Sequence, residues 1–235
     1  MIYVLVHSPS VGPATWERVA ASLRARDQRV AVPDVRAVAN AKPPFWRTIV
    51  ELIRQGLNDL PRGERVVLCG HSNAGLFLPM TAANFGPAVA GLIFVDASLP
   101  PETGGAAMVP PEFLEQLRRQ ASDGYLPRWT EWFPEEDVSP LFPDAETRRR
   151  VSEEQVRLPL AYYEDHVPVP SGWSSSPAGY VLFGPPYDRL AQDVRTRGWP
   201  VIEVPGQHLH MLVDPDGVAQ ALLEIAVSLT HRQRH

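Results

Sequence analysis

One stretch decides the fold class of this chain: VVLCGHSNAG, residues 66–75. Its first four residues are apolar, which is typical of a strand buried on both faces of a parallel sheet. Small residues then flank a serine, and a helical pattern follows to Phe85. A buried strand, a tight turn with a central serine and a helix together form the context of a nucleophile elbow. The pattern therefore predicts that Ser72 is lifted above one edge of a sheet as a nucleophile.

The elbow has a structural alternative, in which Ser72 merely caps a helix after a glycine turn. In an elbow, by contrast, the N-terminus of the following helix and the backbone N–H of Asn73 would face a developing oxyanion. Neighbouring sequence is needed to choose between the two.

Short apolar runs alternate with helical patterns on both sides of this stretch. The apolar runs are residues 2–6, 30–32, 66–69, 92–95, 180–183 and 201–204. Helical spacing of apolar residues occurs between most of them, and a last helix is expected from Pro215 onward. Because crossover helices cover both faces of a parallel sheet, the alternation predicts an α/β fold with a mostly parallel sheet of about six strands.

The alternation is interrupted over residues 100–178, a proline-rich segment with helical patterns near residues 113–117 and 147–163. A structureless loop of this length is uncommon in a compact domain. We therefore expect residues 100–178 to form a helical cap, inserted into a core made of residues 1–99 and 179–235.

Composition restricts the class of protein. Apolar residues make up 44% and charged residues 21% of the 235 residues, which disfavours disorder. The net charge of -5 gives no broad electrostatic reason to bind nucleic acid. No apolar run approaches the roughly 18 to 20 residues of a membrane helix, and the opening residues 1–6 lack the basic start of a signal peptide. The single cysteine, Cys69, excludes an internal disulfide and a multi-cysteine metal site, and it fits a cytoplasmic protein.

A second motif joins the last expected strand to the last helix: PGQHLHMLVDP, residues 205–215. A histidine in this loop would lie at the carboxyl edge of the sheet, on the same rim as Ser72. His208 could then act as general base toward Ser72 and later as acid toward the leaving group. The alternatives are an exposed loop histidine, or His210 in the catalytic role.

With the elbow, the insertion and the late histidine together, the chain resembles the α/β-hydrolase superfamily, especially the small branch of plant methyl esterases and hydroxynitrile lyases. Residues 7–16, HSPSVGPATW, look like that branch's His-Gly loop ending in tryptophan. The stretch from His208 to Pro215 is similar to its His-x-x-Met-Leu-x-x-Pro ending. The family's histidine stands about seven residues before the proline, a spacing that His208 has and His210 lacks. The resemblance thus favours His208 as the base, in a site without metal or cofactor.

The resemblance leaves two positions for the acid that orients His208. In many superfamily members the acid follows a later strand, where Asp188 is available. In others, such as haloalkane dehalogenases, it ends the strand after the elbow helix, which is the position of Asp96. Either carboxylate would hold the imidazole tautomer, while a structural Asp96 would instead satisfy loop amides. We place Asp96 ahead of Asp188.

The first loop departs from the family's pattern. Pro9 stands where the family supplies the second oxyanion N–H, and proline has none. Losing one oxyanion donor typically costs roughly two to three orders of magnitude in rate. The Ser8 hydroxyl is the available substitute. The family's lyases also carry a lysine just after the catalytic histidine, where this chain has Leu209, which argues against a cyanohydrin lyase. His7 and His71 are expected to hydrogen-bond the loop backbone.

Aromatic residues gather in the expected cap, and packing is a stronger expectation for them than a lined acyl pocket. They are Trp129, Trp132, Tyr162, Tyr163 and Trp173.

The sequence leads to three functional hypotheses. The first is a cofactor-free serine hydrolase that cleaves a small or medium apolar carboxylic ester or thioester. The second is a lyase, cyclase or elimination enzyme acting on a biosynthetic intermediate, and the third is a binding protein that kept the hydrolase fold. The expected partners are a small-molecule substrate and, at most, a second copy of the chain.

Overall fold

The computed structural model describes residues 1–58 and 63–232. Within them, six parallel strands form one sheet in the order β2-β1-β3-β4-β7-β8. These strands are β1 (Ile2–Val6), β2 (Arg29–Ala31), β3 (Val66–His71), β4 (Val89–Val95), β7 (Ala178–Leu182) and β8 (Val201–Glu203). The sheet confirms the predicted fold class.

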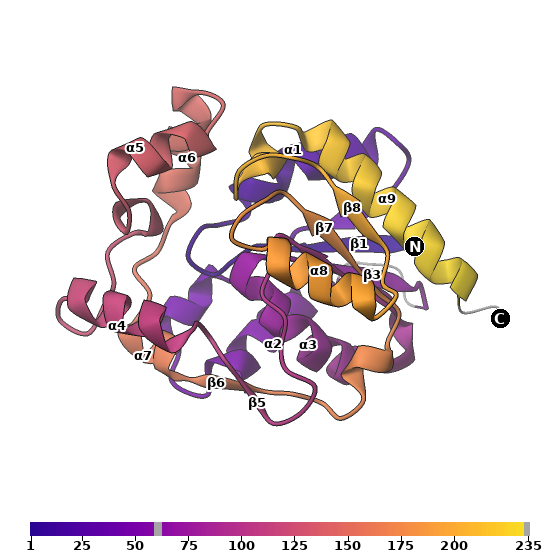
Figure 1. The fold of residues 1–235 in the computed structure, drawn as a ribbon, viewed down its shortest axis with the longest axis horizontal. Helices are drawn as coiled ribbons and strands as arrows, with labels where there is room; N and C mark the ends of the chain where they lie inside the picture. The colour runs from indigo at the N-terminus through magenta and orange to yellow at the C-terminus, as the bar shows by residue number, and fades with distance from the viewer. Residues whose placement is uncertain (59–62, 233–235) are drawn as a thin grey trace.

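Helices cover both faces of the sheet, as Figure 1 shows for α1 and α9 on one side and α2 and α3 on the other. The helices are α1 (Ala14–Arg24), α2 (Phe45–Gln55), α3 (Leu78–Phe85), α4 (Pro111–Gln120), α5 (Glu135–Val138), α6 (Ala145–Glu154), α7 (Leu160–Glu164), α8 (Asp188–Thr196) and α9 (Pro215–Arg232). Alternate side chains of a strand point to opposite faces. Accordingly Ile2, Val4 and Val6 join the apolar cluster with α2, α3 and α8, while Tyr3 and Leu5 join the one with α1 and α9. Full burial of such a side chain contributes about 1.5–3 kcal/mol.

Between β4 and β7 the chain leaves the sheet and forms α4 to α7. A two-stranded antiparallel ribbon of β5 (Gly105–Ala107) and β6 (His166–Pro168) runs alongside. Short 3₁₀ segments are η1 (Arg36–Asn40), η2 (Ser72–Phe77), η3 (Gly86–Ala88), η4 (Trp129–Glu131), η5 (Ser139–Leu141), η6 (Trp173–Ser175) and η7 (His210–Leu212).

Two predicted helices differ in detail from the structure. The pattern over residues 147–163 is divided into α6 and α7, because Pro159 has no N–H to bond the carbonyl of Gln155 and its ring would clash with that carbonyl in a continuous helix. The helix expected after the serine motif, as far as Phe85, begins instead as the tighter 3₁₀ segment η2 and becomes α-helical only at Leu78.

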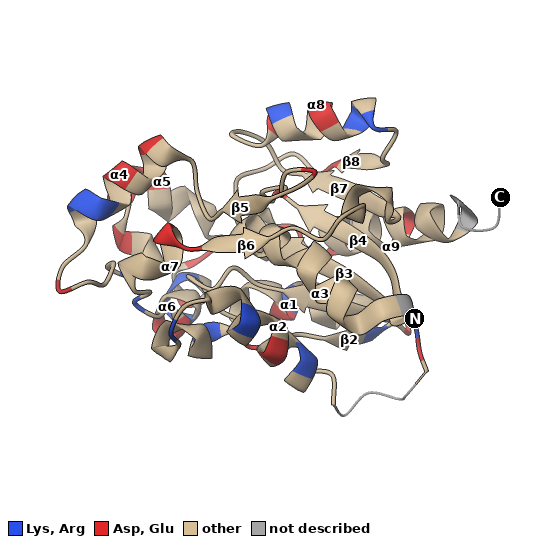
Figure 2. Cartoon of the chain, turned by 90° about the horizontal axis from the view of Figure 1, so that it is seen from below, with Lys and Arg blue, Asp and Glu red and all other residues tan. Residues whose placement is uncertain are grey.

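Charged side chains of both signs are interspersed along the outer helices (Figure 2). On α6, for example, Arg149 pairs with Glu146 and Glu153 at helical spacing. Such exposed pairs contribute little to stability. Within the described residues, no helix is both long and apolar enough to cross a membrane.

Parallel strands place all their carboxyl ends at one edge of the sheet, so the loops after β1, β3, β4, β7 and β8 converge there. His71, the last residue of β3, pairs with Val95, the last of β4. This register sets Ser72 and Asp96 side by side, one residue beyond each strand.

Candidate active site

The turn after β3 has the geometry of a nucleophile elbow. Ser72 has a φ of 57°, in the left-handed region that side chains other than glycine seldom adopt. The turn is also crowded, because a Cβ at Gly75 would lie 2.3 Å from the carbonyl oxygen of Ser98. Only glycine fits at residue 75, which explains the glycine three residues after the serine.

His208 bridges the serine and a carboxylate. Its Nδ1 lies 2.7 Å from Oδ2 of Asp96, and its Nε2 lies 2.9 Å from Oγ of Ser72. Asp96 is buried, with 1% of its surface exposed, and its Oδ1 accepts the backbone N–H of Phe183 at 3.1 Å. Asp96 therefore both contacts the imidazole and satisfies a loop amide. In this arrangement Nδ1–H donates to Asp96, and Nε2 accepts the hydroxyl proton of Ser72.

Two of the sequence-based candidates lie elsewhere. Asp188 is exposed in the first turn of α8, where a carboxylate complements the positive end of the helix dipole. Asp96, and not Asp188, makes the contact with the imidazole of His208. His210 begins η7 with its ring against Gly206 and Phe183, and the ring bonded to Ser72 is that of His208.

Aromatic rings surround the imidazole of His208. Tyr187, from the loop after β7, stacks on it with ring centroids 5.3 Å apart and planes 13° apart. His71 lies 4.5 Å away, centroid to centroid, and Trp129 lies 6.4 Å away. The ring of His208 is thus held by neighbours from three different parts of the chain.

His71 also holds the backbone of the histidine loop, as expected for a structural histidine. Its Nε2–H donates to the carbonyl of His208 at 2.8 Å. Within the described residues its Nδ1 has no hydrogen-bond partner. Burial, and then the nearby His208, hold the pKa of His71 well below its ordinary value, so His71 is neutral and adds no charge beside the base.

The loop after β1 is a tight turn held by its own residues. The carbonyl of Ser8 accepts the N–H of Val11 at 3.1 Å and the Nδ1–H of His7 at 2.8 Å. Pro9 is the second residue of this turn, a position where its fixed φ is favoured. The Ser8 hydroxyl is 3.0 Å from the hydroxyl of Ser10. The Ser8 hydroxyl, which the sequence offered in place of the missing oxyanion N–H of Pro9, is therefore paired within its own loop.

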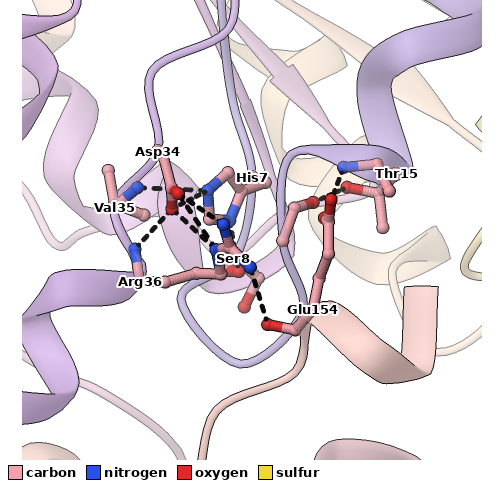
Figure 3. Close-up of polar contacts among 9 residues, drawn as sticks. His7, Ser8, Thr15, Asp34, Val35, Arg36 and Glu154 are labelled. Atoms are coloured by element: carbon pink, nitrogen blue, oxygen red, sulfur yellow. Dashed lines mark hydrogen bonds and ion pairs between the residues drawn. The ribbon is translucent and has the colours of Figure 1, made fainter. Parts of the chain in front are cut away.

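Two anchors fix this loop from outside (Figure 3). On one side, Nε2 of His7 accepts the N–H of Val35 at 3.1 Å, and the guanidinium of Arg36 donates to the Asp34 carboxylate at 2.6 Å. On the other side, the carboxylate of Glu154 accepts the N–H of Ala14 at 2.7 Å, at the start of α1. Glu154 belongs to α6, so the insertion is hydrogen-bonded directly to the end of the first loop.

Asn73 has a side-chain role that the sequence gave no sign of. Its amide donates to the carbonyl of Met108 at 2.7 Å and accepts the hydroxyl of Tyr162. Both partners lie in the insertion, so no local pattern around Asn73 predicts them. The backbone N–H of Asn73, near the start of η2, remains the expected oxyanion donor.

The aromatic residues of the insertion divide between the site and the core. Trp129 is next to His208, and Tyr163 packs edge-on against Tyr162, with ring centroids 4.8 Å apart. Trp132 is buried behind Tyr163, and its indole N–H donates to the Pro127 carbonyl. Trp173 packs against Phe94, a residue of β4. Packing thus accounts for Trp132 and Trp173.

Within the described residues, no group of three or more His, Cys, Asp or Glu side chains is arranged to hold a metal ion. The groups that the structure does bring together at this edge are a serine hydroxyl, an imidazole and a carboxylate.

Comparison with known proteins supports this view of the fold. Esterase PIR7B of Oryza sativa subsp. japonica is 35% identical over 130 residues, which are 53% of this chain and 47% of the rice protein. Methylesterase 3 of Arabidopsis thaliana is 30% identical over 128 residues, 51% of this chain and 46% of its own length. The matched part spans about half the length of these relatives.

The fold and the sequence profile extend over nearly the whole chain. The crystal structure of polyneuridine aldehyde esterase matches with a TM-score of 0.72 at 19% identity, covering 96% of this chain and 98% of that one. Residues 3–221 match the model of the Alpha/beta hydrolase family. With the six-stranded parallel sheet and the elbow after β3, the chain belongs to the alpha/beta hydrolase family.

Proposed function

We propose that this protein is a serine hydrolase that cleaves a small or medium apolar carboxylic ester or thioester. One observation carries the proposal: the imidazole of His208 lies within hydrogen-bond distance of both the Ser72 hydroxyl and the Asp96 carboxylate. The esterase and methylesterase names of the relatives agree with this chemistry.

The first half-reaction acylates Ser72. The Oγ of Ser72 attacks the carbonyl carbon of the substrate while its proton passes to Nε2 of His208, and the carbonyl electron pair moves onto the carbonyl oxygen. The imidazolium is stabilised by the Asp96 carboxylate at Nδ1. Collapse of the tetrahedral intermediate re-forms the carbonyl and expels the alcohol or thiol, which takes the proton from Nε2.

The second half-reaction releases the acid. Water gives a proton to Nε2 of His208 and attacks the acyl carbon, and collapse expels the Oγ of Ser72, which regains that proton. The backbone N–H of Asn73 is the donor we assign to the oxyanion in both halves. Because Pro9 supplies no second N–H, we expect a rate below that of a serine esterase with two backbone donors.

The substrate class follows from the surroundings of His208. Trp129 and Tyr187 present aromatic rings beside the imidazole, which suits an apolar acyl or alcohol group better than a charged one.

A fluorophosphonate probe tests the covalent mechanism. We expect the probe to add to Ser72 of the folded protein, located by mass spectrometry of peptides, and the label to vanish in Ser72→Ala and nearly vanish in His208→Ala. Absence of label on Ser72 in the folded wild-type chain would refute the proposal.

Pro9 also favours a second candidate, a lyase, cyclase or elimination enzyme in which His208 moves protons without an acyl-enzyme. This candidate is distinguished by turnover of p-nitrophenyl acetate. Hydrolysis that disappears in Ser72→Ala supports the hydrolase, whereas no turnover of activated esters, together with a native reaction abolished by His208→Ala, supports the second candidate.

A further inference from the structure

The side chain of Asn73, the residue after the nucleophile, is hydrogen-bonded through both groups of its amide. Its Nδ2–H donates to the carbonyl of Met108 at 2.7 Å, and its Oδ1 accepts the hydroxyl proton of Tyr162. Because a carbonyl oxygen can only accept, the NH₂ group must face Met108, and the phenol is then the donor to Oδ1. Burial raises the pKa of Tyr162 well above its ordinary value, so the phenol keeps this proton at neutral pH.

Met108 and Tyr162 come from the two ends of the insertion. Met108 directly follows β5, and Tyr162 lies in α7, shortly before β6. The antiparallel pairing of β5 with β6 brings the two residues together. The ring of Tyr162 also packs edge-on against Phe45 of α2, with ring centroids 5.7 Å apart. All three partners of the contact, Asn73, Met108 and Tyr162, are buried. The insertion therefore presents a fixed donor and a fixed acceptor to Asn73.

The peptide unit between Ser72 and Asn73 is held from the opposite side as well. The carbonyl of Ser72 accepts the N–H of Ser98, in the loop after β4, at 3.1 Å. In a trans peptide unit the C=O and the N–H point in roughly opposite directions, so the N–H of Asn73 points away from that loop. In the strand order β1-β3-β4 this is the side of the first loop, where Pro9 supplies no N–H.

We propose that Tyr162 is a positioning residue for the oxyanion, because through the side chain of Asn73 it fixes the direction of the Asn73 backbone N–H. This inference rests on the proposed serine hydrolase function, in which that N–H is the oxyanion donor. The peptide unit cannot rotate without breaking the hydrogen bond to Ser98 or those to the insertion. An oxyanion donor is most effective when its direction is set before the charge develops. Since Pro9 supplies no second backbone donor, the rate depends more strongly on the direction of this one.

The variant Tyr162→Phe removes the hydroxyl and keeps the ring that packs on Phe45. The measurement compares p-nitrophenyl acetate with p-nitrophenyl thionoacetate, in which sulfur replaces the carbonyl oxygen that becomes the oxyanion. Sulfur is a weak hydrogen-bond acceptor, so the thiono ester gains little from the Asn73 N–H. We expect Tyr162→Phe to lower kcat/KM for the oxygen ester about 10- to 100-fold, and to lower the oxygen-to-thiono ratio of kcat/KM at least about threefold. An unfolded fraction lowers both values equally and leaves the ratio unchanged.

Asn73→Ala removes both side-chain hydrogen bonds and keeps the backbone N–H. It should lower the same ratio to a similar extent. Adding Tyr162→Phe to Asn73→Ala should cause no further decrease, because both residues act through one contact. Losses that multiply in the double variant would mean that Tyr162 acts elsewhere, and they would overturn the inference.

Tyr3→Phe is the matched control, since Tyr3 is also a buried tyrosine but lies near the amino end of β1, at the opposite edge of the sheet from Ser72. It should keep the wild-type ratio, and an equal decrease in this variant would overturn the inference. Fluorophosphonate labelling of Ser72 tests the proposed function separately. If the wild type is labelled and Tyr162→Phe keeps the wild-type ratio, the inference alone fails. No label on Ser72 in the wild type overturns the proposed function and this inference with it.

Discussion

The tautomer of His208 depends on the chemical identity of one side chain, Asp96. In Asp96→Asn the amide oxygen can still accept the N–H of Phe183, but the NH₂ group would face Nδ1 of His208. Nδ1 must then accept a hydrogen bond, and Nε2 carries the proton and can no longer act as base. We expect kcat/KM to fall by as much as about 10⁴, with unchanged circular dichroism.

Asp188→Asn is the matched control for that experiment and should change kcat/KM by less than about threefold. Asp188 is exposed in the first turn of α8, and its interaction with the helix dipole contributes only about a few tenths of a kcal/mol to stability. The opposite ranking of the two variants would mean that the hydrogen bond between Asp96 and His208 is not the one used in catalysis.

His71 links the stability of the fold to pH. The unfolded chain binds a proton at His71 below the ordinary pKa of 6.5, whereas the folded chain does not until the pH is much lower. Because the unfolded state binds more protons in this window, the free energy of unfolding decreases as the pH falls below about 6.5, by up to about 1.4 kcal/mol per pH unit. This contribution should be missing in His71→Gln.

Urea denaturation at several pH values between about 7 and 5 measures that slope. The control is His166→Gln, at an exposed position of β6, which should keep the wild-type slope. Parallel curves for the wild type and His71→Gln would contradict the linkage.

Single residues were predictable from sequence where the chemistry needs a fixed position after a strand. Ser72, Asp96 and His208 each follow such a strand or lie in the loop after it, so topology alone brings them together. The sequence ranked Asp96 ahead of Asp188 only through the family resemblance, because the residues alone do not show where α8 begins. The stacking of Tyr187 on His208 was not foreseen either, since it depends on the conformation of the loop after β7.

The contact between α6 and the first loop requires a glycine. A Cβ at Gly12 would lie 2.5 Å from Oε2 of Glu154 and 2.8 Å from its Cβ. Gly12→Ala should therefore displace Glu154 and destabilise the fold by about 1–3 kcal/mol, the usual range for overpacking. Gly105→Ala is the control, because its Cβ would meet nothing closer than 3.7 Å.

A double-variant cycle identifies Glu154 as the cause. In chemical denaturation, Glu154→Gly should remove most of the cost of Gly12→Ala, giving a coupling energy of about 1 kcal/mol or more. Additive losses would show that the crowding lies elsewhere.

At the scale of elements, strands and long helices were predictable from hydrophobic periodicity, and irregular helix starts were not. The periodicity of residues 147–163 continues across Pro159, so the pattern alone overlooked the break. The 3₁₀ start at Ser72 follows from the elbow, where the backbone is determined by close packing against Ser98 and not by local preference.

The insertion and the sheet share one apolar core. Tyr162 and Trp173 of the insertion belong to the same apolar cluster as Phe77 and Phe94 of the hydrolase core. The ring centroids are 6.5 Å apart for Tyr162 and Phe77 and 6.0 Å apart for Trp173 and Phe94. A segment that shares its core with the rest of a domain cannot unfold alone without exposing that core.

We therefore expect a single cooperative urea transition, with coincident midpoints for far-ultraviolet circular dichroism and for tryptophan fluorescence. Tyr162→Phe leaves the amide oxygen of Asn73 without its hydroxyl donor and should shift both midpoints together, by about 1–3 kcal/mol in unfolding free energy. An earlier fluorescence transition would indicate that the insertion melts as a separate unit.

The hydrogen bond from His71 to the carbonyl of His208 has a mechanical consequence. The base is carried by the loop after β8, an edge strand, and edge elements are the first to fray. The residue that donates to the carbonyl of His208 is His71, the immediate neighbour of Ser72 at the end of the central strand β3. We therefore expect loosening of β8 to displace the imidazole less than the rest of its loop, because the backbone of His208 is hydrogen-bonded to the end of β3, the strand that leads into Ser72.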